Sequence, residues 1–564
     1  MAINITIDGI RTVAEQGETI LDVAKKLGKE IPTLCHIQNL NPAGACRVCV
    51  VEVNGKLLPS CSTPVQEGMT VKTNTVNVLN ARRDIIEMYL AAHPNTCTTC
   101  FRSGNCTLSE LATTYAIDRI SIPKGYQKRH QDSANPAIVR EPEKCILCGK
   151  CVRVCNEIQG VGAIDFANRG ADTIVTTSFN TVMNSTQCTY CGQCIIACPT
   201  GALHENPHIS RVINALADPK KFVVVQTAPA VRVAIGEEFG MEQGTIVTGK
   251  MAAALRAIGF DLVVDTNFGA DLTIMEEGSE LLHRIKNNGV LPLLTSCSPG
   301  WVKFMEHNYP DLIPNVSSAK SPHEMLGAVV KHIGGKERNI DPKDIYVVSV
   351  MPCVAKKYEA ERPELGQGMI KDVDAVLTTR EAAILMKQMG INLNHMPEDE
   401  FDNPFGESTG AAAIFGRSGG VMEAALRTAY HLITGEELDL IEFEDLGGIG
   451  IREAEVTIQG KKLKVATVSG LAAAKRMMEK IRAGEEYHFV EIMACPGGCI
   501  NGGGQPYPKK DSIKLRTAAL NTIDRACPIR KSHKNNSVLN LYKDHLEKPL
   551  SEKSHHLLHT HYYE

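Results

Sequence analysis

The spacing of apolar and polar residues changes along the chain, and each spacing predicts a kind of element. In INITIDGIRTVAEQ (residues 3–16), apolar residues recur at every second position on both sides of Asp8 and Gly9, which predicts a β-hairpin. TILDVAKKLG (19–28) has helical spacing and predicts an amphipathic helix that closes at Gly28. The chain is therefore expected to begin with two strands and a helix.

Beyond residue 199, continuous apolar runs alternate with helical segments. Residues 221–240 predict a buried strand, a loop and a helix, and residues 344–359 predict a strand followed by a loop. Between them, residues 253–285 predict a helix, a strand, a loop and a second helix. This alternation indicates an α/β region with parallel strands.

Three loops in this region contain cysteine, and each follows an apolar run. They are TSCSPGW (295–301), VSVMPCVAKKYEAE (348–361) and VEIMACPGGCINGGGQP (490–506). Functional sites in α/β folds gather where loops leave the strand ends, so we expect a site here.

Composition narrows the class of protein. The chain has 564 residues, enough for several domains, and its apolar fraction of 43% is that of an ordinary globular protein. The net charge of −4 and the lack of a large basic patch argue against nucleic acid as a partner. The sequence predicts neither a membrane span nor a secretory signal. We therefore expect a cytoplasmic protein, in which clustered cysteines serve metal or redox chemistry instead of disulfides.

Fifteen of the 20 cysteines lie in four groups before residue 200. The first group, Cys35, Cys46, Cys49 and Cys61, follows the predicted hairpin and helix and surrounds a glycine-bearing loop. These elements suggest a small β-grasp domain, and four thiolates at such a loop suit a 2Fe–2S cluster. A structural zinc site is the alternative, because four cysteines also bind zinc.

The second group consists of His93, Cys97, Cys100 and Cys106. Three cysteines and a histidine suit zinc as well as an iron–sulfur cluster, and this spacing does not choose between them. A single histidine near cysteines is also often a bystander and not a ligand.

The third and fourth groups have the spacing C-x2-C-x2-C-x3-C, which is that of bacterial two-cluster ferredoxins. In this pattern the fourth cysteine of each group ligates the other cluster. One cluster is therefore predicted at Cys145, Cys148, Cys151 and Cys198, and the other at Cys188, Cys191, Cys194 and Cys155. Two such groups also favour iron–sulfur clusters over zinc at the first two sites, and a series of clusters serves to pass single electrons.

The three later cysteine loops resemble those of a known family. TSCSPGW (295–301), MPCVAKKYEAE (351–361) and EIMACPGGCINGGGQP (491–506) are similar to the three signature loops of the iron-only, or [FeFe], hydrogenases. QTAPAVRVAIGEE, TIMEEGSELL, SSAKSP and GAAAIFGRSGGVMEAALR match this family as well. The resemblance covers essentially the whole chain, and it is closest to the monomeric clostridial type, which exchanges electrons with ferredoxin.

The resemblance implies a multidomain α+β and α/β architecture. The implied parts are a 2Fe–2S β-grasp ferredoxin domain (1–78), a His/Cys3 4Fe–4S domain (79–125), a two-cluster 4Fe–4S ferredoxin-like domain (136–208), a large α/β H-cluster domain (209–515) and a wrapping segment similar to a small subunit (516–564). The implied cofactors are one 2Fe–2S cluster, three accessory 4Fe–4S clusters and an H-cluster. In the H-cluster, a 4Fe–4S cubane is joined to a two-iron subsite that carries CO, cyanide and azadithiolate.

The resemblance also assigns residues around the H-cluster. Its cysteine ligands match Cys353, Cys495 and Cys499, with Cys499 as the bridging one. The groups that hold the cyanides match Lys356 and the backbone at Pro229 and Ala230, since an ammonium donates to an anionic ligand. The apolar walls match Met351, Met493 and Phe415, which without the resemblance would be taken as ordinary core residues.

Protons need relay groups within hydrogen-bond reach of one another. The relay of the family matches Cys297, Glu277, Ser317, Glu280 and Arg284. Independently of the resemblance, Glu277 and Glu280 are three residues apart on a predicted helix and share a face. A solvated acidic face is the ordinary explanation for such a pair.

The first signature loop departs from the family at one position. The usual loop is T-S-C-C-P-G-W, in which the first cysteine relays protons and the second ligates the cubane, but here the second position is Ser298. Matching by position makes Cys297 the relay and leaves Ser298 as the fourth ligand. Counting cysteines instead makes Cys297 the fourth ligand, with Cys527 left over.

The expected function is the reversible reduction of protons to hydrogen. Ferredoxin or flavodoxin would supply electrons through the clusters, and maturation proteins would supply the two-iron subsite. One alternative is the catalytic subunit of an NADH-coupled, multi-subunit hydrogenase, but no cysteine after Cys527 could ligate a further cluster. The other is a redox sensor or electron carrier with little turnover, which Ser298 keeps open. Neither nucleic acid nor a membrane is expected as a partner.

Overall fold

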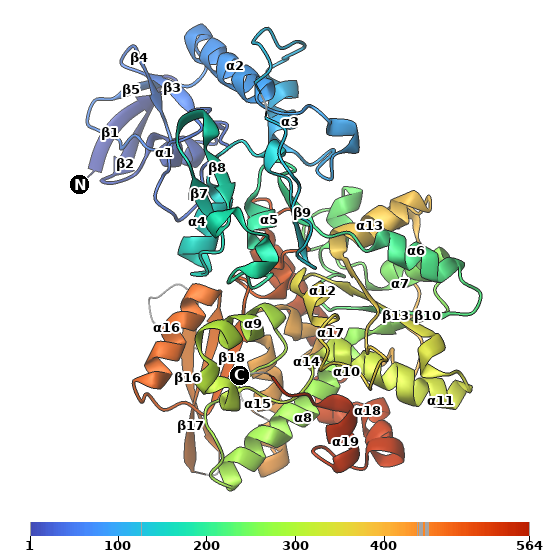
Figure 1. Cartoon of the computed structure of the whole chain (residues 1–564). Helices are drawn as coiled ribbons and strands as arrows, with labels where there is room; N and C mark the ends of the chain where they lie inside the picture. The colour runs from blue at the N-terminus through green and yellow to red at the C-terminus, as the bar shows by residue number, and fades with distance from the viewer. Residues whose placement is uncertain are drawn as a thin grey trace. The chain divides into compact units, whose positions relative to one another are not determined.

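The computed structural model describes residues 2–125, 127–436, 438, 444–445, 450–458 and 460–562. The chain forms two compact units, which Figure 1 shows as a ribbon. The first unit comprises Met1–Cys155, Gly162–Thr186 and Cys194–His204, and the second comprises Asn156–Val161, Gln187–Gln193 and Glu205–Glu564. Within the described part of the chain, no helix is both long and apolar enough to cross a membrane.

The hairpin and helix predicted at the N-terminus are confirmed. β1 (Ala2–Ile7) pairs antiparallel with β2 (Ile10–Glu15) across the predicted turn. α1 (Ile20–Lys26) begins at Thr19, whose hydroxyl accepts from the Asp22 backbone while the Asp22 carboxylate accepts from the Thr19 backbone. This reciprocal capping satisfies two backbone donors that a helix N-terminus otherwise leaves unpaired.

The first unit contains a mixed five-stranded sheet in the order β2-β1-β5-β3-β4. β5 is parallel to β1 and antiparallel to β3, and α1 packs its apolar side against the same core. The other strands are β3 (Val50–Val53), β4 (Lys56–Pro59), β5 (Thr70–Lys72), β6 (Ile138–Arg140), β7 (Asp165–Ala167), β8 (Ile174–Thr176) and β9 (Leu203–Glu205). The other helices are α2 (Val76–Ala91), α3 (Thr107–Thr114), α4 (Lys150–Arg153) and α5 (Gln193–Ala197).

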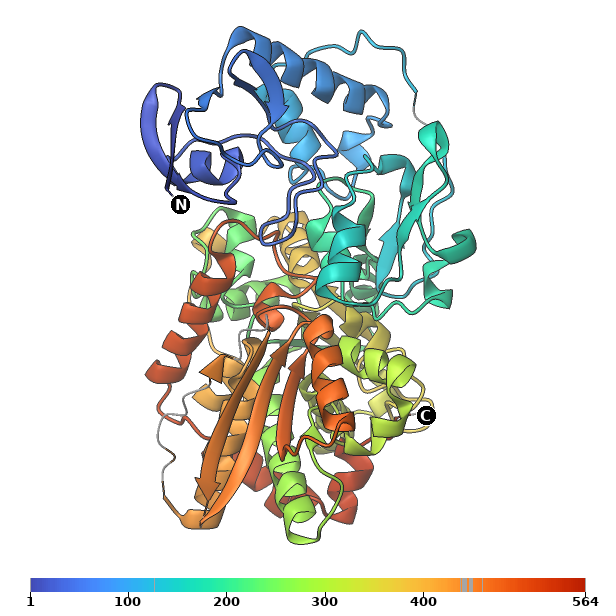
Figure 2. The same ribbon diagram turned by 90° about the vertical axis from the view of Figure 1, so that its left-hand side faces the viewer.

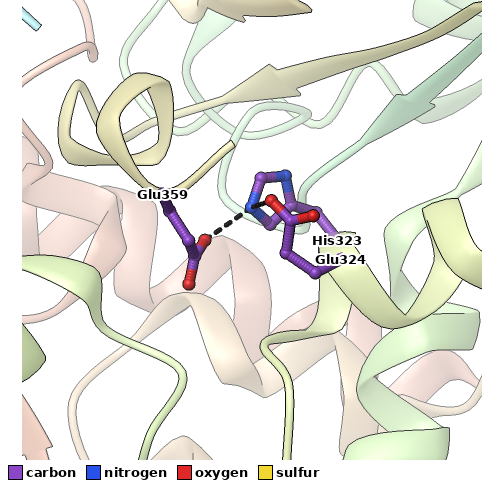
Figure 3. A group of neighbouring side chains, drawn as sticks. All are labelled: His323, Glu324 and Glu359. Atoms are coloured by element: carbon purple, nitrogen blue, oxygen red, sulfur yellow. Dashed lines mark hydrogen bonds and ion pairs between the residues drawn. The ribbon is translucent and has the colours of Figure 1, made fainter. Parts of the chain in front are cut away.

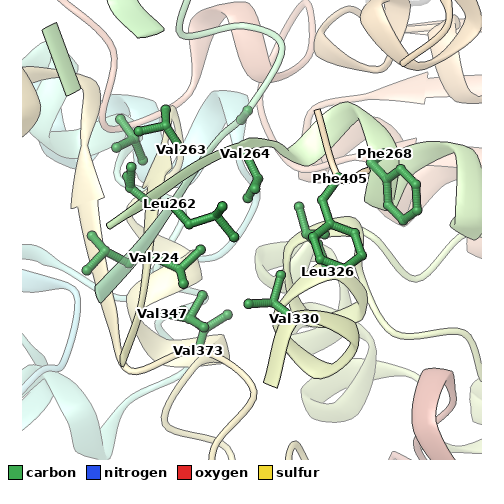
Figure 4. Packing of buried hydrophobic residues seen from close by; sticks show 14 of the residues in the cluster. Val224, Leu262, Val263, Val264, Phe268, Leu326, Val330, Val347, Val373 and Phe405 are labelled. Atoms are coloured by element: carbon green, nitrogen blue, oxygen red, sulfur yellow. The ribbon is translucent and has the colours of Figure 1, made fainter. Parts of the chain in front are cut away.

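The second unit contains the parallel sheet that the sequence predicts, in the order β11-β10-β13-β14. Its strands are β10 (Phe222–Thr227), β11 (Leu262–Asp265), β13 (Ile345–Met351) and β14 (Ala375–Thr378), and every pairing among them is parallel. Figure 4 shows the buried side chains of β10, β11 and β13 next to Leu326 and Val330 of the neighbouring helical segment. Phe268 and Phe405 meet edge to face in this core, with ring centroids 5.5 Å apart.

A second sheet in this unit was not predicted from the sequence. Its order is β12-β18-β17-β16-β15, with β12, β18 and β17 parallel and β16 antiparallel to both of its neighbours. The strands are β12 (Leu293–Leu294), β15 (Glu444–Asp445), β16 (Ile451–Ile458), β17 (Lys461–Ser469) and β18 (Phe489–Met493). Figure 2 looks onto this sheet, with α16 (Leu471–Arg482) in front of its orange strands.

Two sequence predictions on helices are corrected by the structure. α8 (Thr266–Lys286) starts directly after β11, so the loop predicted between them does not exist; Asp265 ends the strand and caps the helix. The helix predicted within 221–240 is only a short 3-10 turn at Ile235–Phe239. Nearby, Arg232 donates to Asp265 at 2.6 Å in a buried ion pair.

The remaining helices surround the two sheets. They are α6 (Ile209–Ala217), α7 (Thr248–Ile258), α9 (Pro299–Asn308), α10 (Pro322–Val329), α11 (Gly335–Arg338), α12 (Ala355–Glu359), α13 (Thr379–Gln388), α14 (Gly410–Ala413), α15 (Gly420–Thr434), α17 (Ser512–Ala526), α18 (Asn536–Leu541) and α19 (Glu552–Leu558).

A buried carboxylate of α8 holds the C-terminal segment in place. The side chain of Glu276 accepts hydrogen bonds from Tyr542 Oη at 2.6 Å, from the Leu550 backbone at 2.9 Å and from Ser554 Oγ, and His559 Nε2 lies 3.0 Å away. Glu276 is thus a buried acid with several donors from one segment, and we call this set the Glu276 anchor.

Candidate active site

The three cysteine loops leave the carboxyl ends of three strands, as the sequence predicts. β12 leads into Thr295, β13 into Pro352 and β18 into Ala494. Because β12 and β18 are parallel neighbours, two of these loops begin side by side, and the fold brings the third to the same place.

A pocket of about 60 Å³ lies where these loops meet. Nine of the residues singled out in the sequence line it: Pro229, Ala230, Cys297, Met351, Cys353, Lys356, Phe415, Met493 and Cys499. Sequence positions separated by more than 250 residues therefore form one mostly apolar chamber with three thiols and one ammonium at its wall.

The thiols at this place are buried close to one another. Burial and, to a smaller extent, the charge of Cys353 raise the pKa of Cys499 to about 12. Burial also raises the pKa of Cys495 well above its ordinary value, with Cys353, Cys191 and Cys499 as further causes. A bound metal ion favours the thiolate form that burial disfavours, so this set of adjacent buried thiols fits an iron cluster.

Glycines bring backbone close to these thiols. A Cβ at Gly503 would lie 2.7 Å from both the Cys191 carbonyl oxygen and Gly192 Cα, so only glycine fits. Gly498 has a φ of +95°, which side chains rarely adopt. Cys495 Sγ lies 4.0 Å from the same Cys191 carbonyl oxygen, so the loop of the fourth cysteine group touches the third signature loop.

Cys297 and Ser298 point to different places. Cys297 lines the pocket, whereas the Ser298 hydroxyl accepts from the Ala494 backbone at 3.2 Å, directly before Cys495. The loop is fixed by Pro299 in the first turn of α9 and by Trp301, whose indole donates to the Thr295 carbonyl at 3.1 Å. The two side chains thus point in the directions that matching by position predicts, and the identity of the fourth ligand stays a prediction. Cys527, the fifth cysteine of the region, lies elsewhere, with its sulfur 3.8 Å from the Ser408 carbonyl oxygen.

Among the five residues matched to a proton relay, hydrogen bonds join Ser317, Glu280 and Arg284, while Glu277 and Cys297 are related by their electrostatic effect on each other. Glu277 lies next to Cys297 and is, after burial itself, the main cause of the raised pKa of that thiol. Ser317 Oγ donates to Glu280 at 2.7 Å, and Arg284 Nη2 donates to the other oxygen of Glu280 at 2.6 Å.

The two acids of this set do not form a solvated face. Glu277 is fully buried and Glu280 is 9% exposed, so the ordinary explanation for this pair is wrong. Burial and, to a smaller extent, the charge of Glu280 raise the pKa of Glu277 to about 7, against the opposing hydrogen bonds from Ser296 and Ser317. A carboxyl with this pKa exchanges protons readily near neutral pH.

Lys356 reaches the pocket from α12. Its ammonium donates to the Cys297 carbonyl at 3.1 Å and to Glu359 Oε2 at 2.6 Å. Glu359 and His323 were not singled out in the sequence. Glu359 could have been found, because it lies three residues after Lys356 on a helix, but His323 has no spacing that links it to the cysteines.

The first cysteine group of the N-terminal unit is brought together. Cys35, Cys46, Cys49 and Cys61 are all buried, and the Cys46 backbone lies 3.4 Å from Cys35 Sγ. Hydrogen bonds from Cys46 and Cys61 lower the pKa values of Cys35 and Cys49, while the pKa values of the two donors are raised. Such a group of thiols in mutual contact fits a metal cluster.

The second group contains a buried histidine nitrogen that is available as a ligand. His93 is 8% exposed, and among the described atoms its Nε2 has no hydrogen-bond partner. Burial lowers the pKa of His93, which keeps the ring neutral, as metal ligation requires. Cys100 Sγ packs against Gly201, and Cys106 Sγ lies 3.7 Å from the Pro199 carbonyl oxygen.

The third group surrounds a small cavity of the first unit. Cys145, Cys148, Cys151 and Cys198 all line it, which is the crossed set that the ferredoxin spacing predicts. The other crossed set is divided, because Cys155 and Cys194 belong to the first unit while Cys188 and Cys191 belong to the second. That set stays a prediction.

Comparison with known proteins decides the family. The sequence profile of the iron only hydrogenase large subunit, C-terminal domain, matches residues 221–503, about half of the chain. This chain belongs to the iron-only hydrogenase family. Other profiles match the iron hydrogenase small subunit (510–564), a 2Fe-2S iron-sulfur cluster binding domain (1–76), the NADH-ubiquinone oxidoreductase-G iron-sulfur binding region (82–121) and a 4Fe-4S dicluster domain (144–202).

Known hydrogenases resemble the chain over its whole length. The NADP-reducing hydrogenase subunit HndD of Solidesulfovibrio fructosivorans is 50% identical over 100% of this chain and 99% of its own. Iron hydrogenase 1 of Clostridium pasteurianum is 41% identical over 99% of both chains. A solved variant of the apo [FeFe]-hydrogenase HydA1 from Chlamydomonas reinhardtii is 44% identical, covers 63% of this chain and 99% of its own, and has a TM-score of 0.58.

These findings confirm the family and the enzyme class expected from the sequence. The chain is an oxidoreductase that acts on hydrogen, with iron–sulfur clusters and an H-cluster domain in a mixed α/β [FeFe]-hydrogenase fold. Zinc at the N-terminal cysteine groups is disfavoured, because the matching profiles of that region are those of iron–sulfur domains.

Proposed function

We propose that this hydrogenase reversibly reduces protons with electrons from ferredoxin or flavodoxin, which reach the H-cluster through one 2Fe–2S cluster and three accessory 4Fe–4S clusters. The observation that carries the proposal is the pocket at the strand ends, where Cys297, Cys353, Lys356 and Cys499 converge. When bound, the H-cluster supplies the redox chemistry that interconverts protons, electrons and hydrogen.

Cys353, Cys495 and Cys499 would hold the cubane, and Cys499 would also bridge to the two-iron subsite. Lys356 would donate to a cyanide of that subsite, because its ammonium lies at the pocket wall and is already oriented by two acceptors. The backbone at Pro229 and Ala230 would hold the other cyanide, and Met351, Met493 and Phe415 would exclude water from the chamber.

Ser298 would take the place of the fourth cubane ligand, as a serinate or beside a weakly held iron. The support is its orientation toward Ala494 and Cys495, away from the pocket that Cys297 lines. Cys297 would then be the last proton carrier.

Protons would enter beside Arg284, whose guanidinium holds Glu280 in place, and would pass through Glu280, Ser317 and Glu277 to the Cys297 thiol. The hydrogen bonds at 2.6 and 2.7 Å on the two oxygens of Glu280 support its place between Arg284 and Ser317. The pKa of Glu277, about 7, suits a group that accepts and releases a proton in each cycle.

Electrons would follow the order of the cysteine groups along the chain. The corresponding parts are a 2Fe–2S β-grasp domain (1–78), a His93-ligated 4Fe–4S domain (79–125), a two-cluster domain (136–208), the H-cluster domain (209–515) and a wrapping segment (516–564). The contact between the loop at Cys191 and that at Cys495 supports electron delivery from the last accessory cluster. A reducing compartment such as the cytoplasm suits so many thiolate ligands.

A second candidate is the catalytic subunit of a pyridine-nucleotide-linked hydrogenase. The observation in its favour is the 50% identity, over the full chain, with a subunit of an NADP-reducing hydrogenase. In such an enzyme another subunit would pass electrons from the nucleotide to this one.

One assay separates the two candidates. The maturated, purified chain is supplied either with reduced ferredoxin or with NADPH or NADH alone, and hydrogen is measured. We expect evolution with ferredoxin and none with the nucleotides. Activity with neither donor, but with a chemical reductant, would favour the subunit, and no activity with any donor would contradict hydrogen turnover by this chain.

A further inference from the structure

A buried histidine lies beside the pocket without a role in the cysteine set or the relay. His323 belongs to α10, is 1% exposed and lines the pocket. Figure 3 shows its ring facing the carboxyl groups of Glu324 and Glu359. A buried imidazole beside a reacting centre can change its charge near neutral pH, so the contacts of His323 deserve a close description.

Three donors converge on one oxygen of Glu359. Oε2 of this carboxylate lies 2.6 Å from Lys356 Nζ, 2.6 Å from His323 Nε2 and 3.0 Å from Ser321 Oγ. A carboxylate oxygen can only accept, so His323 must carry a hydrogen on Nε2. His323 and Lys356 therefore share the same acceptor atom.

His323 gains or loses its proton at the other ring nitrogen, Nδ1. Nδ1 lies 3.2 Å from the hydroxyl of Ser349, which is fully buried in β13. A neutral ring accepts from this hydroxyl and a charged ring donates to it, and rotation of the hydroxyl serves both states. Ser349 can thus pair with Nδ1 in either protonation state of His323.

A metal ion is the other use for these groups. Ligand atoms of His323, Glu324 and Glu359 all lie within 4.8 Å of one another. However, Glu359 Oε2 already binds the Lys356 ammonium, and a cation would have to displace that charge. The geometry therefore favours a proton-responsive network.

We propose that His323 is a positioning residue of the hydrogenase site, which fixes Glu359 and through it the Lys356 ammonium, and which loosens that ammonium when it gains a proton. The inference rests on the proposed function, because the position of Lys356 matters only if the pocket holds the H-cluster. A charged His323 competes with Lys356 for Glu359 Oε2, and the ammonium is then freer to donate into the pocket. When His323 is neutral, the interaction of the Lys356 ammonium with that oxygen is the stronger of the two.

The charged groups around His323 set the pH range of this effect. Burial and the Lys356 ammonium oppose a positive ring, but Glu324 and Glu359 outweigh them and raise the pKa of His323 above its ordinary value of 6.5. Lys320 and Asp372, which form a buried pair at 2.7 Å, adjoin this group, since Asp372 and Glu324 affect each other. His323 therefore titrates on the alkaline side of a free histidine.

The test uses the maturated full chain and the infrared bands of its CO and cyanide ligands, followed over a range of about pH 6 to 9. In the unaltered protein we expect the cyanide bands to shift as one proton titrates. His323→Gln should abolish that titration while the bands themselves persist. Glu324→Gln should keep it but move its midpoint to lower pH, because one of the two stabilising carboxylates is gone.

His533→Gln is the matched control, because His533 is also a buried histidine of this unit and does not line the pocket. The cyanide bands of this variant should shift with pH as they do in the unaltered protein. The inference is overturned if His323→Gln titrates like the unaltered protein, or if His533→Gln loses the titration as well. Should His323→Gln fail to fold, an unchanged midpoint in Glu324→Gln would overturn it. Absence of the ligand bands from the unaltered, maturated protein would instead contradict the proposed function.

Discussion

At the scale of single residues, the site depends on which way two neighbouring side chains point. Cys297 faces the pocket and Ser298 faces Ala494 because the loop between β12 and α9 is held by Pro299 and by the buried indole of Trp301. Although a thiolate is a far better iron ligand than a hydroxyl, we propose Ser298 and not Cys297 at the cubane because the Cys297 side chain faces the pocket.

Cys297→Ala should abolish hydrogen evolution and spare the cubane, because it removes the last proton carrier and no ligand. Ser298→Cys should strengthen retention of the cubane. Iron content, the cubane signal and hydrogen evolution are measured on each variant. Loss of the cubane signal in Cys297→Ala would show that Cys297 is the fourth ligand.

Glu280→Gln should lower turnover in both directions by a factor of 100 or more, roughly the contribution of a positioned acid–base group, because an amide cannot carry a proton onward. Every cluster should remain intact. Rates are measured against pH, since removing the charge of Glu280, which helps to raise the Glu277 pKa to about 7, should move the corresponding inflection to lower pH.

The control for this variant is Glu423→Gln. Glu423 pairs with Arg427 four residues later in α15, as Glu280 pairs with Arg284 in α8; it also pairs with Arg417, and neither arginine belongs to the proposed relay. Equal loss of activity in both variants would point to a general effect of breaking such a pair and would argue against a proton path through Glu280.

The sequence indicated most of these residues, and the reason for the exceptions is physical. The ferredoxin-type cysteines were identified by their fixed spacing, whereas Lys356 and the two acids were assigned only because their segments resemble those of the family. His323 of α10 contacts Glu359 of α12 only in the folded chain. No local sequence pattern predicts this contact.

At the scale of elements, the helix α8 connects the proposed relay to the C-terminal segment. Glu277 and Glu280 belong to the proposed relay, whereas the adjacent Glu276 receives the donors of the Glu276 anchor. Despite burial, which raises it, the pKa of Glu276 is lowered by hydrogen bonds from His559, Ser554 and Tyr542.

Glu276→Gln should destabilise the protein by about 3 kcal/mol, because it leaves buried donors facing an amide group. Amide hydrogen exchange should increase mainly in residues 536–562, and chemical denaturation gives the free energy. Since the folded-state pKa is lowered, the stabilisation is complete above the ordinary pKa of 4.5 and is lost as the pH falls below it.

Glu552→Gln serves as the control, because this exposed acid lies in α19 of the same segment. It should change neither the exchange nor the stability. An unaltered exchange pattern in Glu276→Gln would show that other contacts hold the segment.

The parallel sheet was predictable from its continuous apolar runs, but the second sheet was not. β12 has only two residues, and β16 and β17 lie side by side as a long antiparallel pair inside a region that reads as α/β. The direct passage from β11 into α8 was also missed, because Asp265 both ends the strand and caps the helix and so replaces a connecting loop.

At the scale of the whole molecule, the clustered cysteines and the pocket lie mainly in different compact units. The first contains three sets of clustered cysteines, and the second contains the pocket. The cysteine side chains of both units are buried or half-buried apart from Cys97, so nearly all of them are available for resident clusters and protected from oxidation.

Fully maturated protein should contain about 20 irons, of which two, twelve and six belong to the 2Fe–2S cluster, the accessory 4Fe–4S clusters and the H-cluster. Elemental analysis checks this number, and zinc is measured in the same sample. Zinc in place of iron at the N-terminal groups would contradict electron transfer through them.

The Glu276 anchor has a consequence for assembly. Residues 510–564 match the profile of a hydrogenase small subunit, and here they are joined covalently to the rest of the catalytic region. A tethered segment meets its docking site at an effective concentration in the millimolar range, whatever the concentration of the protein. Weak contacts therefore suffice to keep it docked, and dilution, which would separate a two-chain enzyme into its subunits, leaves this single-chain arrangement intact.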